Sequence, residues 1–182
     1  MAIYSKHPQI KKKTVSIKGE RMNNTCIYSD MIINEDTIRV YNIHLASNWF
    51  KNTDYSFIQN PQKEKLKEGI IGITKRMKSS FIKRSEEVEI IKQHIADCTY
   101  PIIICGDFND TPLSYAYNSI KGDLSDAFNI SGKGIGDSFV KIPALRIDYI
   151  LHDNELNSSN YQKHKQVLSD HYAVSCEIEI VN

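Results

Sequence analysis

Two features are missing from this 182-residue sequence: long apolar runs and an excess of either charge. No apolar stretch approaches the roughly 20 residues that a membrane-spanning helix needs, and residues 1–6 do not resemble a signal peptide. Lysine and arginine total 23 against 22 aspartates and glutamates, so the net charge of +1 gives no general attraction to nucleic acid or anionic membranes. If the chain is complete as given, we expect a cytoplasmic protein in which any polyanion binding is local.

Cysteine is also scarce, and its four residues lack the spacing of a metal site. Three of them lie in apolar surroundings typical of small buried thiols, so we expect all four to be reduced. The residues are Cys26, Cys98, Cys105 and Cys176. The first 21 residues are basic, with lysines at 11–13, and a solvated turn is the favoured interpretation over a phosphate-binding segment.

The most informative stretch runs from Pro101 to Pro112. Its apolar part, residues 101–106, predicts a central strand buried on both faces. Asp107 and Asn109 follow, and in extended chain they would point to the same side at the strand end, where α/β proteins usually bind ligands. A carboxylate there needs a metal, a cation or a catalytic task. The alternative is a simple turn that leads into a helix capped by Thr111.

Other elements are indicated by periodicity and turn residues. We expect strands at residues 2–4, 25–33, 37–45, 144–151 and 172–181, with a hairpin turn at 34–36. The composition of residues 63–98 favours two helices with a break near Ser79 and Ser80, whose lysines and glutamates face water. Short helices are expected at 113–121 and 124–128, and loops at 52–62 and 131–136.

Four strand ends carry polar residues that could form one site. They hold His44; Asp107 with Asn109; Asp148; and Asp170 with His171. Each has an ordinary alternative, since a lone histidine can be a satisfied core residue, Asp148 could pair with Arg146, and a Ser-Asp pair before a strand is a common turn. Because all of them lie at the ends of apolar strands, we expect them to converge on one cleft, with a hydrogen bond between Asp148 and His171.

Five pieces of the chain, in order, carry a resemblance to a known family. The segments AIYSKHP, VYNIHL, ICGDFNDTP, RIDYIL and SDHYAV resemble those of the endonuclease/exonuclease/phosphatase superfamily, also called deoxyribonuclease-I-like. The resemblance implies an α/β fold of the α+β type, a four-layer sandwich of two packed mixed β-sheets flanked by helices. It also implies hydrolysis of phosphate esters with a divalent cation, Mg²⁺ or Mn²⁺.

The resemblance also implies roles for single residues. His44 would contact the scissile phosphate or aid the leaving group, and Asp107 would activate or orient the attacking water. Asn109 would hold a phosphate oxygen. Asp148 would orient His171, which would act on the phosphate as a base or a charge stabiliser. Asp170 would lie at or beside the metal, so Asp170 and Asp107 are the expected metal-site residues.

The family pattern begins upstream of the AIYSKHP piece, with an asparagine that contacts phosphate and a glutamate that binds the metal. We therefore expect residues 1–182 to be a single domain that lacks its first strands, about a third of the usual length. Alone it should bind magnesium weakly, turn over slowly or not at all, and self-associate, whereas the full-length form should be a monomer. The expected partner is a phosphate ester, with nucleic acid and a phospholipid headgroup both open. The alternative is an inactive module that binds a phosphate ligand or nucleic acid.

Overall fold

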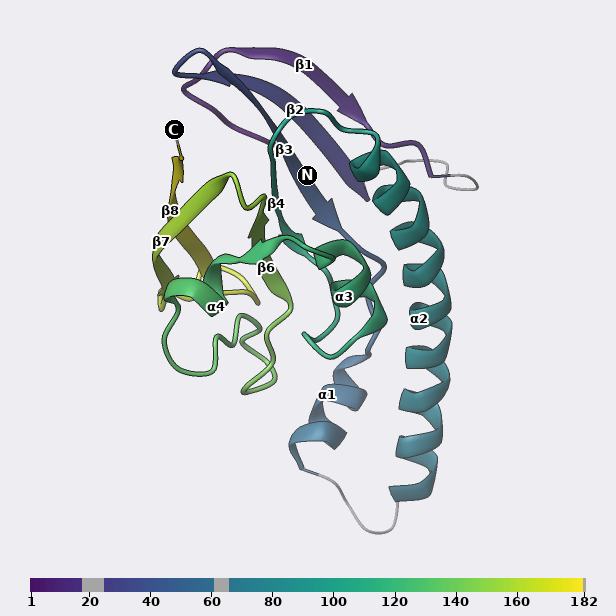
Figure 1. Cartoon of the computed structure of the whole chain (residues 1–182). Coiled ribbons are helices and arrows are strands. Elements are labelled where there is room, and N and C mark those ends of the chain that lie inside the picture. Colours follow the sequence, from purple (N-terminus) through teal and green to yellow (C-terminus); the bar gives the residue numbers. More distant parts are fainter. Residues whose placement is uncertain (18–24, 61–65, 182) are drawn as a thin grey trace.

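The computed structural model describes residues 1–17, 25–60 and 66–181 of the chain, and Figure 1 shows how its elements are arranged. The strands are β1 (Gln9–Thr14), β2 (Cys26–Ile33), β3 (Asp36–His44), β4 (Ile102–Asp107), β5 (Ser125–Asp126), β6 (Asp148–His152), β7 (Leu156–His164) and β8 (Ala173–Ile180). The helices are α1 (Asn52–Gln59), α2 (Leu66–Ala96), α3 (Tyr115–Lys121) and α4 (Ala127–Ser131). No helix of the described residues combines the length and apolar character that a membrane crossing requires.

The strands form two sheets. The larger is six-stranded with the order β1-β2-β3-β4-β6-β5, and β7 pairs with β8 in the smaller one. The larger sheet is mixed, because β3 and β4 run parallel whereas its other neighbours are antiparallel. The expected hairpin between β2 and β3 turns through Asn34 and Glu35, both at positive φ, as a tight hairpin turn requires.

The main core lies between the six-stranded sheet and the helices α2 and α3. Tyr41, Ile43 and Ile104 project from the sheet and pack with Val88 and Ile91 of α2. Figure 1 shows α2 running along this side of the sheet. Burial of these apolar side chains is the main force that holds the helices on the sheet.

The opposite face of β4 and β6 packs against α4 and the β7-β8 sheet, through a second cluster around Ile150 and Tyr161. The predicted α/β sandwich with two packed sheets is therefore confirmed, although the smaller sheet is antiparallel rather than mixed. Strand β4 is fully buried only on its helix side. Ile103 and Cys105, which face the smaller sheet, are half-buried because that sheet has only two strands here.

The loop predicted at 52–62 was wrong over residues 52–59, which form α1, and residues 61 and 62 lie outside the described residues. The carboxylate of Asp54 accepts a hydrogen bond from the Lys51 backbone N–H at 2.6 Å and caps the helix. Asp54 is buried and also binds Arg76 of α2. The cap itself is local, but the Asp54 carboxylate is also held by Arg76, 22 residues away along the chain, and this contact is not visible in local composition.

The break predicted near Ser79 and Ser80 was also wrong, since α2 is continuous over Leu66–Ala96. Ser80 is buried and donates its hydroxyl hydrogen to the carbonyl of Ser47 at 2.8 Å, so it is a contact point rather than a break. The polar residues of α2 do not all face water either, because Arg84 and Glu87 are buried. Residues 63–65, also expected to be helical, lie outside the described residues.

Several smaller expectations need correction. Residues 2–4 do not form a strand, and residues 11–13 lie in the exposed edge strand β1 rather than in a turn. Lysines on an edge strand discourage pairing with other chains. Helix α3 is capped by Ser114, whose hydroxyl accepts from Tyr117 N at 3.1 Å, and not by Thr111. The short helix expected at 124–128 is present but shifted, because residues 125–126 form β5 and α4 runs from Ala127 to Ser131. Strand β6 begins only at Asp148, and β7 was not foreseen.

Candidate active site

Three neighbouring strands bring polar residues to one edge of the large sheet. In the parallel pair β3 and β4, His44 lies opposite Asp107, and in the antiparallel pair β4 and β6, Asp107 lies opposite Asp148. Gly106 makes this close approach feasible, since a Cβ atom there would lie 2.0 Å from the carbonyl oxygen of Ile43. The local sequence thus fixes Asp107 between two strands that each add a titratable side chain.

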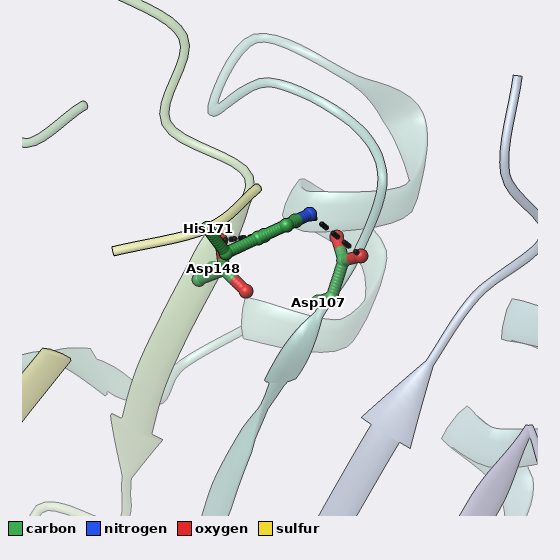
Figure 2. A group of neighbouring side chains, drawn as sticks. All are labelled: Asp107, Asp148 and His171. Atoms are coloured by element: carbon green, nitrogen blue, oxygen red, sulfur yellow. Dashed lines mark hydrogen bonds and ion pairs between the residues drawn. The ribbon is translucent and has the colours of Figure 1, made fainter. Parts of the chain in front are cut away.

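His171 joins this group from the segment that precedes β8. Its Nδ1 lies 2.7 Å from Asp148 Oδ2, and its Nε2 lies 3.8 Å from Asp107 Oδ2 (Figure 2). The imidazole therefore bridges the two carboxylates. The hydrogen bond expected between Asp148 and His171 is present, whereas Arg146, the alternative partner of Asp148, binds Asp126 at 2.9 Å.

Buried Ser138 holds the segments that carry these groups. Its hydroxyl accepts hydrogen bonds from the backbone N–H groups of Ile147 and Asp148 at 3.1 and 3.0 Å. Its carbonyl accepts from the N–H of Tyr172 at 2.7 Å, next to His171. One residue thus aligns the start of β6 with the segment before β8.

Asn109 is bound closely to Asp107. Its backbone N–H donates to Asp107 Oδ1 at 2.8 Å, and its side-chain amide donates to Asp107 Oδ2 and to the Leu45 carbonyl, both at 3.0 Å. The backbone of Asn109 has a φ of 52°, a left-handed conformation that asparagine tolerates better than most residues. Both amide hydrogens of the side chain are therefore engaged.

Burial and the neighbouring Asp148 carboxylate raise the pKa of Asp107 from its ordinary value to about 6. The hydrogen bond to Asp148 raises the pKa of His171, so the charged imidazolium is favoured. A base that titrates near neutrality next to a cationic donor is a typical arrangement for acid–base chemistry.

The remaining expected residues lie at the margin of this group. His44 has 55% of its side chain exposed, and its Nε2 is 3.6 Å from Asp107 Oδ2. Asp170 is half exposed and accepts a hydrogen bond from Lys141 Nζ at 3.1 Å, which lowers the pKa of its carboxyl. All six expected residues line a single cavity of about 950 Å³: His44, Asp107, Asn109, Asp148, Asp170 and His171.

The same group contains a set of atoms that fits a divalent cation. Among the described residues, ligand atoms of Asp107, Asp148 and His171 lie within 4.8 Å of one another, whereas Asp170 is not part of this group. Two carboxylates and an imidazole suit Mn²⁺ well, and Mg²⁺ would use mainly the carboxylate oxygens.

Arg84 is a supporting residue that sequence reasoning missed. This buried side chain of α2 binds Asp110 Oδ2 at 3.0 Å, the Ala46 carbonyl at 2.7 Å and Asn48 Oδ1 at 3.1 Å. It thereby fixes the segments that follow β3 and β4. Arg84 precedes Val88 by four residues on the apolar stripe of α2, and this position was the available signal.

The fold agrees with comparisons to known proteins. The solved structures include an endonuclease/exonuclease/phosphatase from Bacteroides vulgatus, with 16% identity and a TM-score of 0.63, which covers 96% of this chain and 66% of that one. The human Nocturnin catalytic domain with bound sulfate has 15% identity and a TM-score of 0.61, covering 95% and 60%. A mannosyl-6-phosphatase of Bacteroides thetaiotaomicron has 14% identity and a TM-score of 0.56, covering 95% and 67%.

These structures show a shared fold, and this chain spans only 60 to 67% of their lengths. The sequence has no significant match among curated proteins. A family model described as the endonuclease/exonuclease/phosphatase family matches residues 1–171. Because this match covers nearly all of the sequence, the chain belongs to the endonuclease/exonuclease/phosphatase family.

Proposed function

We propose that this protein is a divalent-metal-dependent phosphoesterase that hydrolyses phosphate esters by attack of water on phosphorus. The observation that carries the proposal is the contact series Asp148–His171–Asp107 at the edge of a cavity. A phosphate ester resists anionic nucleophiles, so its hydrolysis needs positive charge on its oxygens and a positioned water. The described site offers a base and a histidine held by an acid for these tasks.

Asp107 is the proposed base. Its carboxylate lies between His44 and His171 at the edge of the cavity, where it accepts a proton from the attacking water. His171, held as imidazolium by Asp148, donates a hydrogen bond to a phosphate oxygen. His44 is exposed beside Asp107 and is the proposed donor of the proton that the leaving oxygen takes up.

Asp107 and Asp148 are the residues whose carboxylate oxygens would hold the metal, while His171, as an imidazolium, has no lone pair for the ion and stays with the phosphate. We keep Asp170 as a flanking carboxylate that must first leave Lys141. A bound Mg²⁺ or Mn²⁺ supplies positive charge that polarises the phosphate and lowers the pKa of a bound water.

Asn109 is proposed to be a positioning residue. Because both hydrogens of its side-chain amide are donated, to Asp107 and to Leu45, the amide orients the Asp107 carboxylate instead of reaching into the cavity. Substitution by aspartate would place a second negative charge against Asp107 and should raise the pKa of that base further.

The proposal is tested by hydrolysis of p-nitrophenyl phosphate and bis(p-nitrophenyl) phosphate with Mg²⁺ or Mn²⁺, with chelator as the blank. We expect release of nitrophenol that requires the metal and is lost in His171→Gln. His7→Gln, at a histidine outside the cavity lining, is the matched control. Metal-dependent phosphate binding without turnover of either ester would favour the binding-module alternative.

A further inference from the structure

The cavity at the candidate active site extends well beyond the acids and histidines. Its polar side consists of the strand ends, and its other side is built from residues 49–50, α1, α2 and residues 139–147. The lining there is apolar and includes Trp49, Tyr55, Ile58, Ile73, Met77 and Ile142. The volume of about 950 Å³ lies at the upper end of the usual range for small-molecule sites.

We propose that this apolar side binds the alcohol portion of the substrate, so that the protein selects esters of a single phosphate with an aromatic or alkyl alcohol. The inference rests on the proposed phosphoesterase function and names its substrate class. It follows from the continuity of the cavity, because a phosphate beside His171 would project its ester group toward the apolar wall.

Aromatic rings lead from the candidate catalytic group into this wall. Measured between ring centroids, Phe139 lies 5.1 Å from the imidazole of His171 and 6.0 Å from Tyr55. The centroid of Phe50 lies 5.8 Å from that of Tyr55. The end of α1 is tied to the same wall by a hydrogen bond of 2.8 Å from Gln59 Nε2 to the Lys141 carbonyl. The apolar side is therefore a connected surface, and an aromatic or alkyl group there would replace water against it.

The charges of the cavity disfavour a substrate with further phosphates. No lysine or arginine is among the described residues that line it, whereas four aspartates are. One lysine, Lys141, lies next to the lining and is paired with Asp170 in this structure, and Arg84 is held by Asp110. Binding of nucleic acid depends on lysine and arginine at successive phosphates, so this cavity suits one phosphate and one apolar group.

Trp49 provides a direct readout of binding. It is the single tryptophan of the sequence, it lines the cavity, and 74% of it is exposed. A ligand with an apolar group should cover this indole and shift its fluorescence. This signal requires no turnover and therefore separates the substrate-class inference from the phosphoesterase proposal.

The test titrates the full chain, at constant Mg²⁺, with methylphosphonate, phenylphosphonate and hexylphosphonate, none of which can be hydrolysed as an ester. Each buried methylene tightens binding by up to about fourfold, so we expect phenylphosphonate or hexylphosphonate to bind at least about tenfold more tightly than methylphosphonate. The two apolar ligands distinguish an aromatic from an aliphatic alcohol.

Variants of α2 test whether the apolar lining causes the preference for phenylphosphonate over methylphosphonate. Ile73→Gln and Met77→Gln, both in the lining, should bring the phenyl-to-methyl preference close to one. Ile71→Gln changes the same residue type two positions away, where the side chain is exposed and outside the lining, and should keep the full preference. Two lining variants are included so that a folding defect in one does not decide the result.

Equal binding of all three phosphonates would overturn the inference. It would also be overturned if a single-stranded oligonucleotide, counted per phosphate group, displaced phenylphosphonate at a concentration lower than that of phenylphosphonate itself. Equal kcat/KM values for methyl and phenyl esters would overturn it as well, while leaving the phosphoesterase proposal intact. Tight, Ile73-dependent binding of phenylphosphonate without hydrolysis of any ester would support the inference and contradict the phosphoesterase proposal.

Discussion

Replacing Asp107 by asparagine should stabilise the metal-free protein at alkaline pH. Burial and the nearby Asp148 carboxylate raise the pKa of Asp107 from 3.8 to about 6, so the folded state holds this proton more tightly than the unfolded state. The contribution of protonated Asp107 to the free energy of unfolding is fully present below about pH 4 and is lost as the pH rises through about 6. Above that range the wild-type protein carries a buried charge that the variant lacks.

The size of the effect follows from the shift. A difference of about two pKa units between the folded and unfolded states, at roughly 1.4 kcal/mol per unit, means that ionised Asp107 lowers the free energy of unfolding by about 3 kcal/mol at pH 8. Asparagine retains an oxygen for the backbone N–H of Asn109 but loses the bond from the Asn109 side-chain amide, which costs about 1 kcal/mol. The net gain for Asp107→Asn should therefore be about 2 kcal/mol at pH 8 and should shrink toward pH 5.

Urea unfolding with chelator, at several pH values from 5 to 8, measures this difference. Asp170→Asn is the control, because the bond from Lys141 lowers the pKa of that carboxyl and its removal should give no gain at pH 8. Addition of Mn²⁺ should stabilise the wild type more than the Asp107→Asn variant. If Asp107→Asn is less stable than wild type at pH 8, or if the difference does not change with pH, the assigned environment of Asp107 is wrong.

Other variants should separate chemistry from stability. His171→Gln should lower kcat about 100-fold or more with an unchanged circular dichroism spectrum, since the loss of one preorganised donor costs about 3 kcal/mol in the transition state; a smaller effect would argue against its contact with phosphate. Arg84→Met should lower the free energy of unfolding by about 3 to 5 kcal/mol in urea, because it leaves Asp110, whose side chain is only 11% exposed, without its cation, and Asp110→Asn in the same chain should restore part of the loss. Cys105→Ala should change stability alone, because burial raises the pKa of this thiol to about 12; abolished turnover in a folded Cys105→Ala protein would point to a thiol mechanism.

The site was more predictable from sequence than several of the elements around it. Asp107, Asp148 and His44 end apolar strands, and strand alternation fixes the face on which such residues lie. Their convergence with His171 was expected because all of them lie at the ends of predicted strands, and the five sequence pieces that carry the family resemblance added the roles. The pairing of β6 with β4 is not a local property of the chain and was not predicted. The roles assigned to these residues stay predictions until activity is measured.

The unforeseen features depend on partners distant in sequence. Helix α1 is capped by Asp54, which is itself held by Arg76, and Ser80 stays inside a continuous helix because it binds Ser47. Ser138 and Arg84 are ordinary polar residues by composition, and only the folded structure brings them to the backbone groups that they bind. The helix and strand propensities of single residues carry no information about such long-range contacts.

The central claim, hydrolysis at phosphorus by water activated beside Asp107, is tested most directly in ¹⁸O-labelled water. Bis(p-nitrophenyl) phosphate is incubated with the protein and Mg²⁺ or Mn²⁺, and the ¹⁸O content of each product is measured by mass spectrometry. This measurement also detects slow turnover. The account predicts one ¹⁸O atom in each p-nitrophenyl phosphate released, none in nitrophenol, and no labelled product with chelator or with Asp107→Asn. Label in nitrophenol, or the same labelled phosphate product from Asp107→Asn, would contradict it.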